Sequence, residues 1–255
     1  MTIRVVLAGA TGWVGRALVP AVLGSGDLAL AGAVSRSKAG EDAGAAAGLP
    51  PVGVALSSTL EAALDMPSDV VVDYTKPGAM KRHVLLALEK GRRVVVGTSG
   101  LGAADYAEIE AAAKANGLGV IAAGNFSITA TLLKRFALMA AKYVRDVEVI
   151  DYASAKKPDA PSGTARELAE ALAAVRQPST ARPVSEVTGV PGTRGAAVGE
   201  GAGVQVHALR MPSFILSCEA LFGLPDERLT IRHDAGSSAA PTWPARCWPC
   251  GEWER

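Results

Sequence analysis

The stretch that decides the fold reads IRVVLAGATGWVG and runs from Ile3 to Gly15. Its first six residues are mostly apolar and β-branched, as in a buried strand, and a helical pattern follows its glycines around Leu18 and Val22. Glycines between a strand and a helix let the backbone turn tightly and approach a pyrophosphate, whose charge meets the helix N-terminus. We therefore expect a strand, a phosphate-binding turn and a helix at the start of this chain.

Strands and helices continue to alternate beyond this stretch. Short β-branched runs predict strands at 28–34, 70–74, 94–97 and 120–123, and helical patterns lie between them at 79–89 and 103–116. Such an alternation requires crossover connections and a parallel sheet. The sequence thus predicts an α/β fold that begins with a Rossmann-type, doubly wound parallel sheet over residues 1–126. Pro20 lies inside the first predicted helix and should kink it, because proline removes a backbone hydrogen bond.

The second half of the chain, residues 127–233, predicts a separate α+β domain. Helices are expected at 129–143 and 165–175, and strands at 147–152, 204–209, 214–222 and 228–233. The stretch 178–203 is rich in Gly, Pro and Thr, which is typical of a flexible loop that carries function. Open strand edges in this domain suit an oligomer. We expect the last segment, 234–255, to return to the first domain.

Composition and charge narrow the classes of function. Of the 255 residues, 49% are hydrophobic and 20% are charged, which is the composition of a folded globular protein. A net charge of +1 creates no basic field, which argues against a nucleic-acid partner. No apolar run is long enough to cross a bilayer and no export signal is visible, so we expect no membrane association. Three cysteines, an odd number, point to the reducing cytoplasm.

Residues after the second predicted strand bear on the choice of cofactor. An NAD-preferring site usually places Asp or Glu there for the ribose hydroxyls, whereas this chain reads SRSK from Ser35 to Lys38. Hydroxyls and the guanidinium fork of Arg36 suit a 2′-phosphate. We therefore favour NADPH and keep NADH as the alternative. Glu41 and Asp42 nearby count against this preference.

Two more segments come where predicted parallel strands end, at Asp73–Pro77 and Gly97–Gly100. Ligands of open α/β sheets lie at the carboxyl ends of the strands, so these segments are expected to line the nicotinamide side of a cofactor. Taken singly, each is as well explained as an ordinary loop.

The most specific stretch reads KKPDAPSGT, from Lys156 to Thr164. A loop that ends in Ser-Gly-Thr before a helix offers backbone N–H groups and hydroxyls to an anion, and Lys157 adds a positive charge. We predict that Lys157, Ser162, Gly163 and Thr164 hold the carboxylate of a small molecule. The alternative is structural: Ser162 or Thr164 caps the helix and the lysines are solvated.

These motifs together resemble the 4-hydroxy-tetrahydrodipicolinate reductase family of lysine and diaminopimelate biosynthesis. The match covers about residues 3–235 and includes GATGWVG at 9–15 and KPDAPSGTA at 157–165, of which the second is highly specific to that family. The resemblance implies an NAD(P)H-dependent oxidoreductase with a nicotinamide-binding domain and a substrate and tetramerisation domain. It further implies hydride transfer to a cyclic unsaturated dicarboxylate by a homotetramer.

By position, the resemblance also assigns contacts. Lys157, Gly163 and Thr164 would face the substrate, and Ser154 stands where the family has a substrate-binding histidine. The residues implied to contact the cofactor are Gly9, Ala10, Thr11, Gly12, Trp13, Val14, Ser35, Arg36, Gly97, Thr98, Ser99, Ala123, Gly124, Asn125 and Phe126.

One departure from the family concerns the proton donor. The family carries a His-His pair, whose first histidine donates the proton, where this chain has Ala153 and Ser154. Ser217 replaces a further family histidine. Lys157 or Tyr152 would then have to supply the proton, and both are candidate catalytic residues.

Other interpretations stay open. Tyr152 and Lys156 have the Tyr-x-x-x-Lys spacing of short-chain dehydrogenases, in which the lysine lowers the pKa of the tyrosine. A paralogous reductase of another imine or carbonyl substrate would also lack the histidine pair. A non-catalytic, cofactor-binding regulator would lack it as well.

The tail, 242–255, is unusual because it holds three of the four tryptophans and has no helical or strand period. A one-base shift of plausible GC-rich codons turns it into an amphipathic helix, so we expect a frameshift near Pro241. Cys247 and Cys250 have CxxC spacing, yet no second ligand pair accompanies them. We predict no metal site.

Overall fold

The computed structural model describes residues 2–98, 100–189 and 194–238. Contacts divide these residues into two compact units, and the boundary falls between Phe126 and Ser127. Residues up to Phe126 form what we call the first unit, and Ser127–Ser238 form the second unit. Of the segment expected to return to the first domain, residues 234–238 belong to the second unit, and the remainder lies outside the described residues.

The first unit is built on a six-stranded sheet in the order β3-β2-β1-β4-β5-β6, and every pair of neighbouring strands is parallel. The strands are β1 (Ile3–Ala8), β2 (Leu28–Val34), β3 (Leu56–Ser57), β4 (Val70–Asp73), β5 (Arg93–Val96) and β6 (Val120–Ala122). The helices are α1 (Trp13–Leu23), α2 (Ala43–Ala46), α3 (Leu60–Ala63), α4 (Pro77–Glu89) and α5 (Ala103–Asn116). This order, with its reversal at β1 and β4, confirms the predicted Rossmann-type doubly wound sheet.

Alternation along β1 explains why both faces of this sheet are covered. Val5 and Leu7 point into a core that includes Leu18 of α1, whereas Val6 points into a second core that includes Met80 of α4. Both cores are lined almost entirely by Ala, Val and Leu, as a chain with few aromatic residues requires. Both faces of the sheet are therefore buried against helices.

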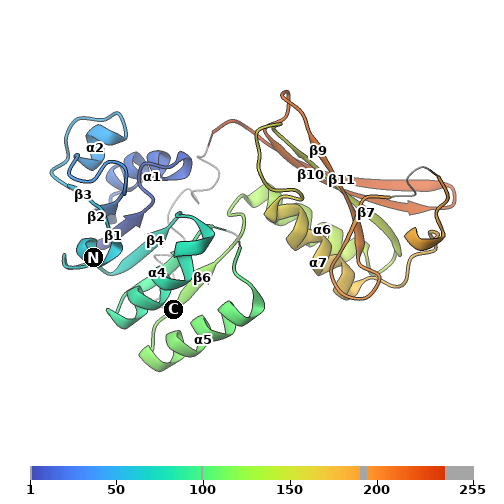
Figure 1. The fold of residues 1–255 in the computed structure, drawn as a ribbon, viewed down its shortest axis with the longest axis horizontal. Helices are drawn as coiled ribbons and strands as arrows, with labels where there is room; N and C mark the ends of the chain where they lie inside the picture. The colour runs from blue at the N-terminus through green and yellow to red at the C-terminus, as the bar shows by residue number, and fades with distance from the viewer. Residues whose placement is uncertain (1, 99, 190–193, 239–255) are drawn as a thin grey trace. The chain divides into compact units, whose positions relative to one another are not determined.

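The second unit is built on a five-stranded sheet in the order β11-β10-β7-β9-β8. Its strands are β7 (Asp146–Ala153), β8 (Ala196–Val198), β9 (Val204–Arg210), β10 (Leu216–Leu224) and β11 (Glu227–Ala235). The pairs are antiparallel except β7 with β9. Helices α6 (Ile128–Ala140) and α7 (Gly163–Val175) pack on one face of this sheet through a single core (Figure 1). The predicted α+β class is confirmed.

Strand β7 alternates regularly, and this alternation positions the site residues of the second unit. Val147, Val149, Asp151 and Ala153 are buried on the face that α6 and α7 cover, whereas the side chain of Tyr152 lies on the opposite face. The side chains of neighbouring residues on this strand therefore point to opposite faces of the sheet.

The helix predicted around Leu18 is present as α1, with Pro20 inside it. Two expectations about local structure need correction. The strand expected at 214–222 begins later, at Leu216, and ends at Leu224. The stretch 178–203 is not a loop throughout, because it contains a 3-10 turn (Val184–Glu186) and β8.

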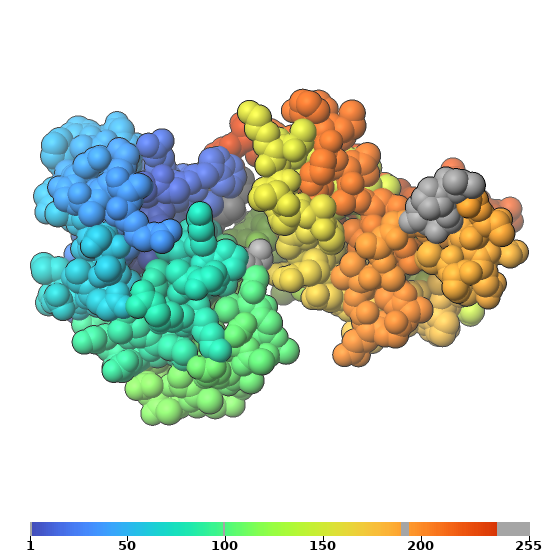
Figure 2. All heavy atoms as spheres, in the orientation of Figure 1, coloured from blue at the N-terminus to red at the C-terminus, as the bar shows by residue number. Residues whose placement is uncertain are grey.

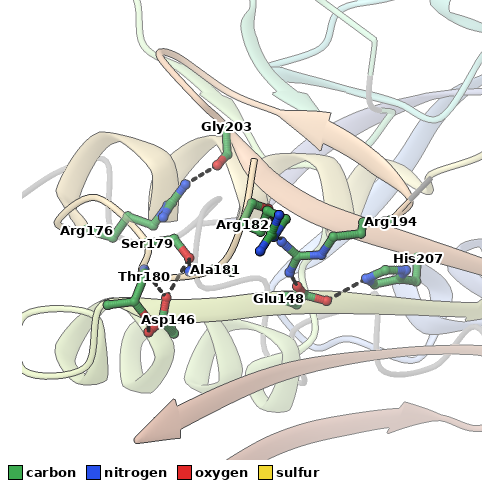
Figure 3. A network of polar contacts seen from close by, with 10 residues as sticks. All are labelled: Asp146, Glu148, Arg176, Ser179, Thr180, Ala181, Arg182, Arg194, Gly203 and His207. Atoms are coloured by element: carbon green, nitrogen blue, oxygen red, sulfur yellow. Dashed lines mark hydrogen bonds and ion pairs between the residues drawn. The ribbon is translucent and has the colours of Figure 1, made fainter. Parts of the chain in front are cut away.

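The segment between α7 and β9 lies on the surface, where Figure 2 shows it in yellow-orange to orange beside the grey residues. Its start is tied to β7 because the Asp146 carboxylate accepts hydrogen bonds from Ser179 and from both the N–H and the hydroxyl of Thr180 (Figure 3). Further along, Arg194 pairs with Glu148 on the same strand. The anchoring polar groups all come from β7, so this loop is attached to the sheet at several points.

No helix among residues 2–98, 100–189 and 194–238 combines the length and the apolar character needed to cross a bilayer.

Candidate functional site

The predicted phosphate-binding turn, residues 9–15, leaves no room for a side chain at its first and last glycines. Gly9 has a φ of +87°, and a Cβ there would lie 2.6 Å from the carbonyl oxygen of Tyr74. A Cβ on Gly15 would lie 2.1 Å from the carbonyl oxygen of Gly9. Helix α1 then begins at Trp13, and its N-cap residue, Gly12, supplies no capping side chain. The first backbone N–H groups of α1 are therefore available to an anion, as a pyrophosphate site requires.

Three hydrogen bonds join the turn to the end of β2: the N–H groups of Gly9 and Ala10 both donate to the carbonyl of Val34, and the third joins two side chains. The hydroxyls of Thr11 and Ser35 lie 2.7 Å apart, and the N–H of Ser35 donates to the carbonyl of Ser57 on β3. Ser35 is 5% exposed, so its hydroxyl is committed to this contact. The residue that follows, Arg36, is exposed and forms no ion pair with any residue in the described ranges.

The two acidic residues that counted against a 2′-phosphate site have other partners. Glu41 forms an ion pair of 2.9 Å with Lys38. The carboxylate of Asp42 accepts backbone hydrogen bonds from Ala45, which it caps at the start of α2, and from Val52 and Gly53. These backbone donors, Ala45 first, hold the pKa of Asp42 below its usual value. Asp42 therefore has a structural role.

A buried polar chain organises the loop after β4. Asp73 is 0% exposed, and one carboxylate oxygen accepts both the N–H and the hydroxyl of Thr75, at 2.7 and 2.6 Å. The other oxygen lies 2.8 Å from Nδ1 of His83 on α4. Thr98, from the loop after β5, donates to the carbonyl of Thr75 at 2.8 Å. Thr75 and Thr98, which belong to two of the segments predicted to line the cofactor, are thus brought together at the carboxyl edge of the sheet.

Tyr74 and Gly97 pack directly against each other at this edge. A Cβ on Gly97 would lie 2.0 Å from the Tyr74 ring, so any other residue there would require the ring to move. Burial raises the pKa of the Tyr74 hydroxyl, which keeps it protonated. Ala123 follows β6 and donates its N–H to Val96, and Phe126 packs against the core beside β1. Ser99, also predicted to contact the cofactor, lies outside the described residues.

In the second unit, the loop from Lys157 to Thr164 connects β7 to α7. Helix α7 starts at Gly163, and its N-cap residue is Ser162, whose hydroxyl oxygen accepts from the N–H of Ala165 at 3.4 Å. The ammonium of Lys157 lies 2.7 Å from the Asp159 carboxylate. The loop thus gathers a lysine and the first turn of a helix, both of which attract a carboxylate.

Ser162 has the structural role that the sequence analysis gave as the alternative. Its N–H and its hydroxyl both donate to the carboxylate of Asp151, each at 2.7 Å, and the residue is 2% exposed. Ser162 therefore shapes the loop, as in the structural alternative. That it also touches a substrate stays a prediction. Sequence reasoning missed Asp151, although its place in an alternating strand marked it as a buried carboxylate.

Tyr152 and Asp151, which holds the 157–164 loop through Ser162, point to opposite faces of the sheet. The Tyr152 hydroxyl donates to Glu219 at 3.3 Å, the Arg232 guanidinium lies 4.6 Å from the ring centroid, and the Phe214 ring packs edge-on. Burial, followed by the nearby Glu219 charge, raises the pKa of Tyr152. These contacts hold the Tyr152 ring against the surface of the sheet. Because its pKa is raised, Tyr152 is a weaker acid than a free tyrosine.

The positions of the three missing histidines are occupied by small residues. Ala153 is 0% exposed, and Ser217 is 5% exposed on β10. Ser154 follows β7, and its hydroxyl accepts a hydrogen bond from the N–H of Lys156 at 3.4 Å. None of these side chains carries a group that titrates near neutral pH, so Lys157 is the one predicted proton donor that belongs to the 157–164 loop.

Comparisons with known proteins cover nearly the whole chain. The family model described as "Dihydrodipicolinate reductase, N-terminus" matches residues 3–126, and the model described as "Dihydrodipicolinate reductase, C-terminus" matches residues 129–240. The chain belongs to the dihydrodipicolinate reductase family. The resemblance stated from the motifs alone is thereby confirmed.

Named relatives agree with this assignment. The 4-hydroxy-tetrahydrodipicolinate reductase of Moorella thermoacetica is 39% identical over 241 residues, which cover 94% of this chain and 88% of the relative. That of Desulfitobacterium hafniense strain DCB-2 is 38% identical over 235 residues, with 91% and 87% covered. A solved structure, dipicolinate-bound dihydrodipicolinate reductase from Paenisporosarcina sp. TG-14, has a TM-score of 0.75 at 32% identity and covers 94% of this chain and 92% of that chain.

Proposed function

We propose that this member of the dihydrodipicolinate reductase family is an NAD(P)H-dependent 4-hydroxy-tetrahydrodipicolinate reductase. The observation that carries the proposal is the match to both halves of the family model, over residues 3–126 and 129–240. The geometry supports it in each unit separately. The first unit has a turn in which a Cβ fits at neither Gly9 nor Gly15, and the second has a loop that presents a lysine and a helix N-terminus.

The first unit would hold the cofactor, and its residues fit that group. The tight approaches at Gly9 and Gly15 leave backbone alone beside the N-terminus of α1, where a pyrophosphate would lie. Residues 97–98 and 123–126 would border the nicotinamide, which supplies the hydride when bound. We further propose NADPH over NADH, because Arg36 is exposed without an ion-pair partner in the described ranges while Glu41 and Asp42 are engaged elsewhere.

The second unit would hold the substrate, a cyclic unsaturated dicarboxylate. Lys157 and the first-turn N–H groups of Gly163 and Thr164 would bind one carboxylate. The relative from Paenisporosarcina was solved with dipicolinate bound, and dipicolinate is an aromatic dicarboxylate of the same class. Because Asp159 neutralises Lys157 in this structure, a substrate carboxylate must compete with Asp159 for the ammonium.

Reduction adds one hydride and one proton across the double bond of the substrate. We propose that Lys157 donates the proton, because it is the titratable cation of the 157–164 loop and the family histidines are absent here. Lysine donates from an ammonium and recovers the proton from water. Tyr152 stays the alternative donor, although its ring lies on the other face of the sheet.

A steady-state assay tests this function. Oxidation of NADPH with 4-hydroxy-tetrahydrodipicolinate is followed by the absorbance of the reduced nicotinamide. Lys157→Met should lower kcat by roughly 10² to 10⁴, the usual cost of losing a positioned acid, while Tyr152→Phe should leave kcat unchanged. A wild-type protein that binds NADPH and dipicolinate but oxidises no NADPH would count against a reductase.

A second function deserves a test because of Ala153 and Ser154. A protein without the family histidine pair is compatible with a reductase of another imine or carbonyl, or with a cofactor-binding regulator. Turnover of other cyclic imino acids, greater than that of 4-hydroxy-tetrahydrodipicolinate, would favour the first of these. NADPH binding without any turnover would favour the regulator. Replacing both residues by histidine should raise kcat if the lysine-pathway substrate is the correct one.

A further inference from the structure

Asp151 is a buried carboxylate that the proposed reaction does not use. It lies on β7, is 0% exposed and faces the core that α6 and α7 cover. Burying a carboxylate costs free energy unless donors surround it. Three donors do so here: the N–H and hydroxyl of Ser162, each at 2.7 Å, and Nη2 of Arg210 at 2.8 Å.

The contact with Ser162 determines how α7 begins. The two donors of Ser162 bind different oxygens of Asp151, so the carboxylate fixes both the backbone and the side chain of this residue. The same Ser162 hydroxyl accepts from the N–H of Ala165 and caps the helix. Asp151 thereby sets the direction in which the first-turn N–H groups of Gly163 and Thr164 point.

The contact with Arg210 fixes the middle of the same loop. Arg210 ends β9, the parallel neighbour of β7, and its side chain is 17% exposed. Its Nη2 reaches both the Asp151 carboxylate and the carbonyl of Asp159, the latter at 2.7 Å. Its Nη1 donates to the carbonyls of Asp151 and Leu209. Asp159 in turn pairs with Lys157, so the position of the ammonium also depends on this arginine.

We propose that Asp151, together with Arg210, is a positioning residue that holds the 157–164 loop in the conformation that binds the substrate carboxylate. This inference rests on the proposed function, because it assumes that the loop binds a carboxylate. Asp151 touches neither substrate nor cofactor in this account. It acts through Ser162 at one point of the loop and through Arg210 and Asp159 at the other.

The charge of Asp151 is essential to this role. Asparagine has nearly the same size, but its NH₂ group is a donor and would face Ser162 or Arg210, which are donors too. Asp151→Asn therefore breaks the contact of residue 151 with either Ser162 or Arg210, while β7 itself stays folded. Misplacement of a binding group by about 1 Å costs on the order of 10²-fold in rate. We expect KM for the substrate to rise by roughly tenfold to a hundredfold.

The chain offers a matched control on the same strand. Asp146 also lies on β7 and accepts three hydrogen bonds from a loop, those of Ser179 and Thr180 (Figure 3). That loop follows the opposite end of α7 from the 157–164 loop. Asp146→Asn removes a comparable set of contacts and should leave both KM and the dissociation constant of dipicolinate unchanged.

The test compares wild type, Asp151→Asn, Arg210→Lys and Asp146→Asn. Arg210→Lys keeps the positive charge but loses the guanidinium group that binds Asp151 and Asp159 together. This variant tests the proposal if Asp151→Asn does not fold. Calorimetric titration gives the dissociation constants of dipicolinate and NADPH, and kinetics give KM and kcat. We expect the first two variants to bind dipicolinate roughly tenfold or more weakly, with NADPH binding unchanged.

Three results would overturn the inference. The first is wild-type affinity for dipicolinate in both loop variants, and the second is an equal loss of affinity in Asp146→Asn. A loss of NADPH binding that matches the loss of dipicolinate binding would also overturn it, since general unfolding explains that pattern. Failure of the proposed function looks different. In that case the wild-type protein itself binds no dipicolinate or reduces no substrate.

Discussion

At the scale of single residues, Arg36 carries the proposal that this protein prefers NADPH over NADH. It follows a serine whose hydroxyl is committed to Thr11, and the nearby acidic residues are neutralised or engaged in capping. The guanidinium is therefore the group in this region that can recognise a 2′-phosphate. The sequence suggested this role, but only the contacts of Glu41 and Asp42 remove the objection to it.

Arg36→Ala should separate the two cofactors. A hydrogen bond to a charged group is worth about 1.5–3 kcal/mol, so KM for NADPH should rise roughly 10- to 100-fold while KM for NADH stays the same. Lys38→Ala is the matched control, because Lys38 is already paired with Glu41. Steady-state kinetics with both cofactors measure the effect. An equal rise for NADH and NADPH would contradict the assignment.

His233 is expected to make the stability of the second unit depend on pH. Its Nδ1 lies 3.0 Å from the Thr129 hydroxyl, its Nε2 is buried without a hydrogen-bond partner among the described residues, and burial lowers its pKa below 6.5. Below about pH 6.5 the unfolded chain takes up a proton that the folded protein does not, so the free energy of unfolding falls. Above that pH the histidine is neutral in both states and contributes no pH dependence.

His233→Asn should weaken this dependence. Asparagine keeps a polar atom near Thr129 but does not titrate, so the free energy of unfolding should fall less between about pH 6.5 and pH 5. Urea unfolding at a series of pH values measures the slope. A variant that loses stability as steeply as the wild type would show that other groups cause the loss.

At the scale of elements, α1 shows how tertiary packing overrides a local preference. Leu18, Val19 and Val22 are buried against β1 and β2, while Pro20 lies on the exposed side of the helix. Pro20 has no N–H to donate to the carbonyl of Arg16. Because this part of the helix is exposed, water can donate to that carbonyl instead, and the lost hydrogen bond costs less than it would on the buried side of the helix. The helix therefore continues through the proline.

Pro20→Ala should stabilise the first unit. Restoring the hydrogen bond to Arg16 and removing the ring should raise the free energy of unfolding by about 1–3 kcal/mol, because proline is the poorest helix former. Chemical denaturation measures the change. No gain in stability would mean that the ring makes contacts that compensate for the lost hydrogen bond.

Prediction from sequence succeeded where the signal was local. The glycine turn, the strands on either side of it and the segments at the carboxyl edge follow from periodicity and from the rule that parallel strands share an edge. The short strands β3 and β8 were missed because two or three residues carry no period. Asp151 and Arg210 were missed because 59 positions separate them, and no spacing in the sequence indicates that they meet.

At the scale of the whole molecule, the two units have separate interiors. The first has a core on each face of its sheet, the second has one core beneath two helices, and no described residue belongs to cores of both units. Each unit buries its own apolar surface, which is the property of a domain that can unfold by itself. The homotetramer implied by the resemblance stays a prediction, and light scattering on the purified protein would test it.

NADPH should protect the first unit more than the second against unfolding. A ligand at a hundred times its dissociation constant stabilises the protein that binds it by about 2.7 kcal/mol. Hydrogen exchange followed by mass spectrometry should show the largest slowing in β1, β2 and α1. Exchange that slows equally throughout both units would show that they unfold as one.

The bond between Thr11 and Ser35 has a practical consequence for anyone who wishes to redesign cofactor choice. Position 35 is the obvious place to introduce an aspartate for the ribose of NADH. That exchange would also alter the only side-chain hydrogen bond of Thr11 among the described residues, within the segment proposed to bind the diphosphate. Engineers should therefore leave Ser35 intact and vary the solvent-facing positions from 36 onward.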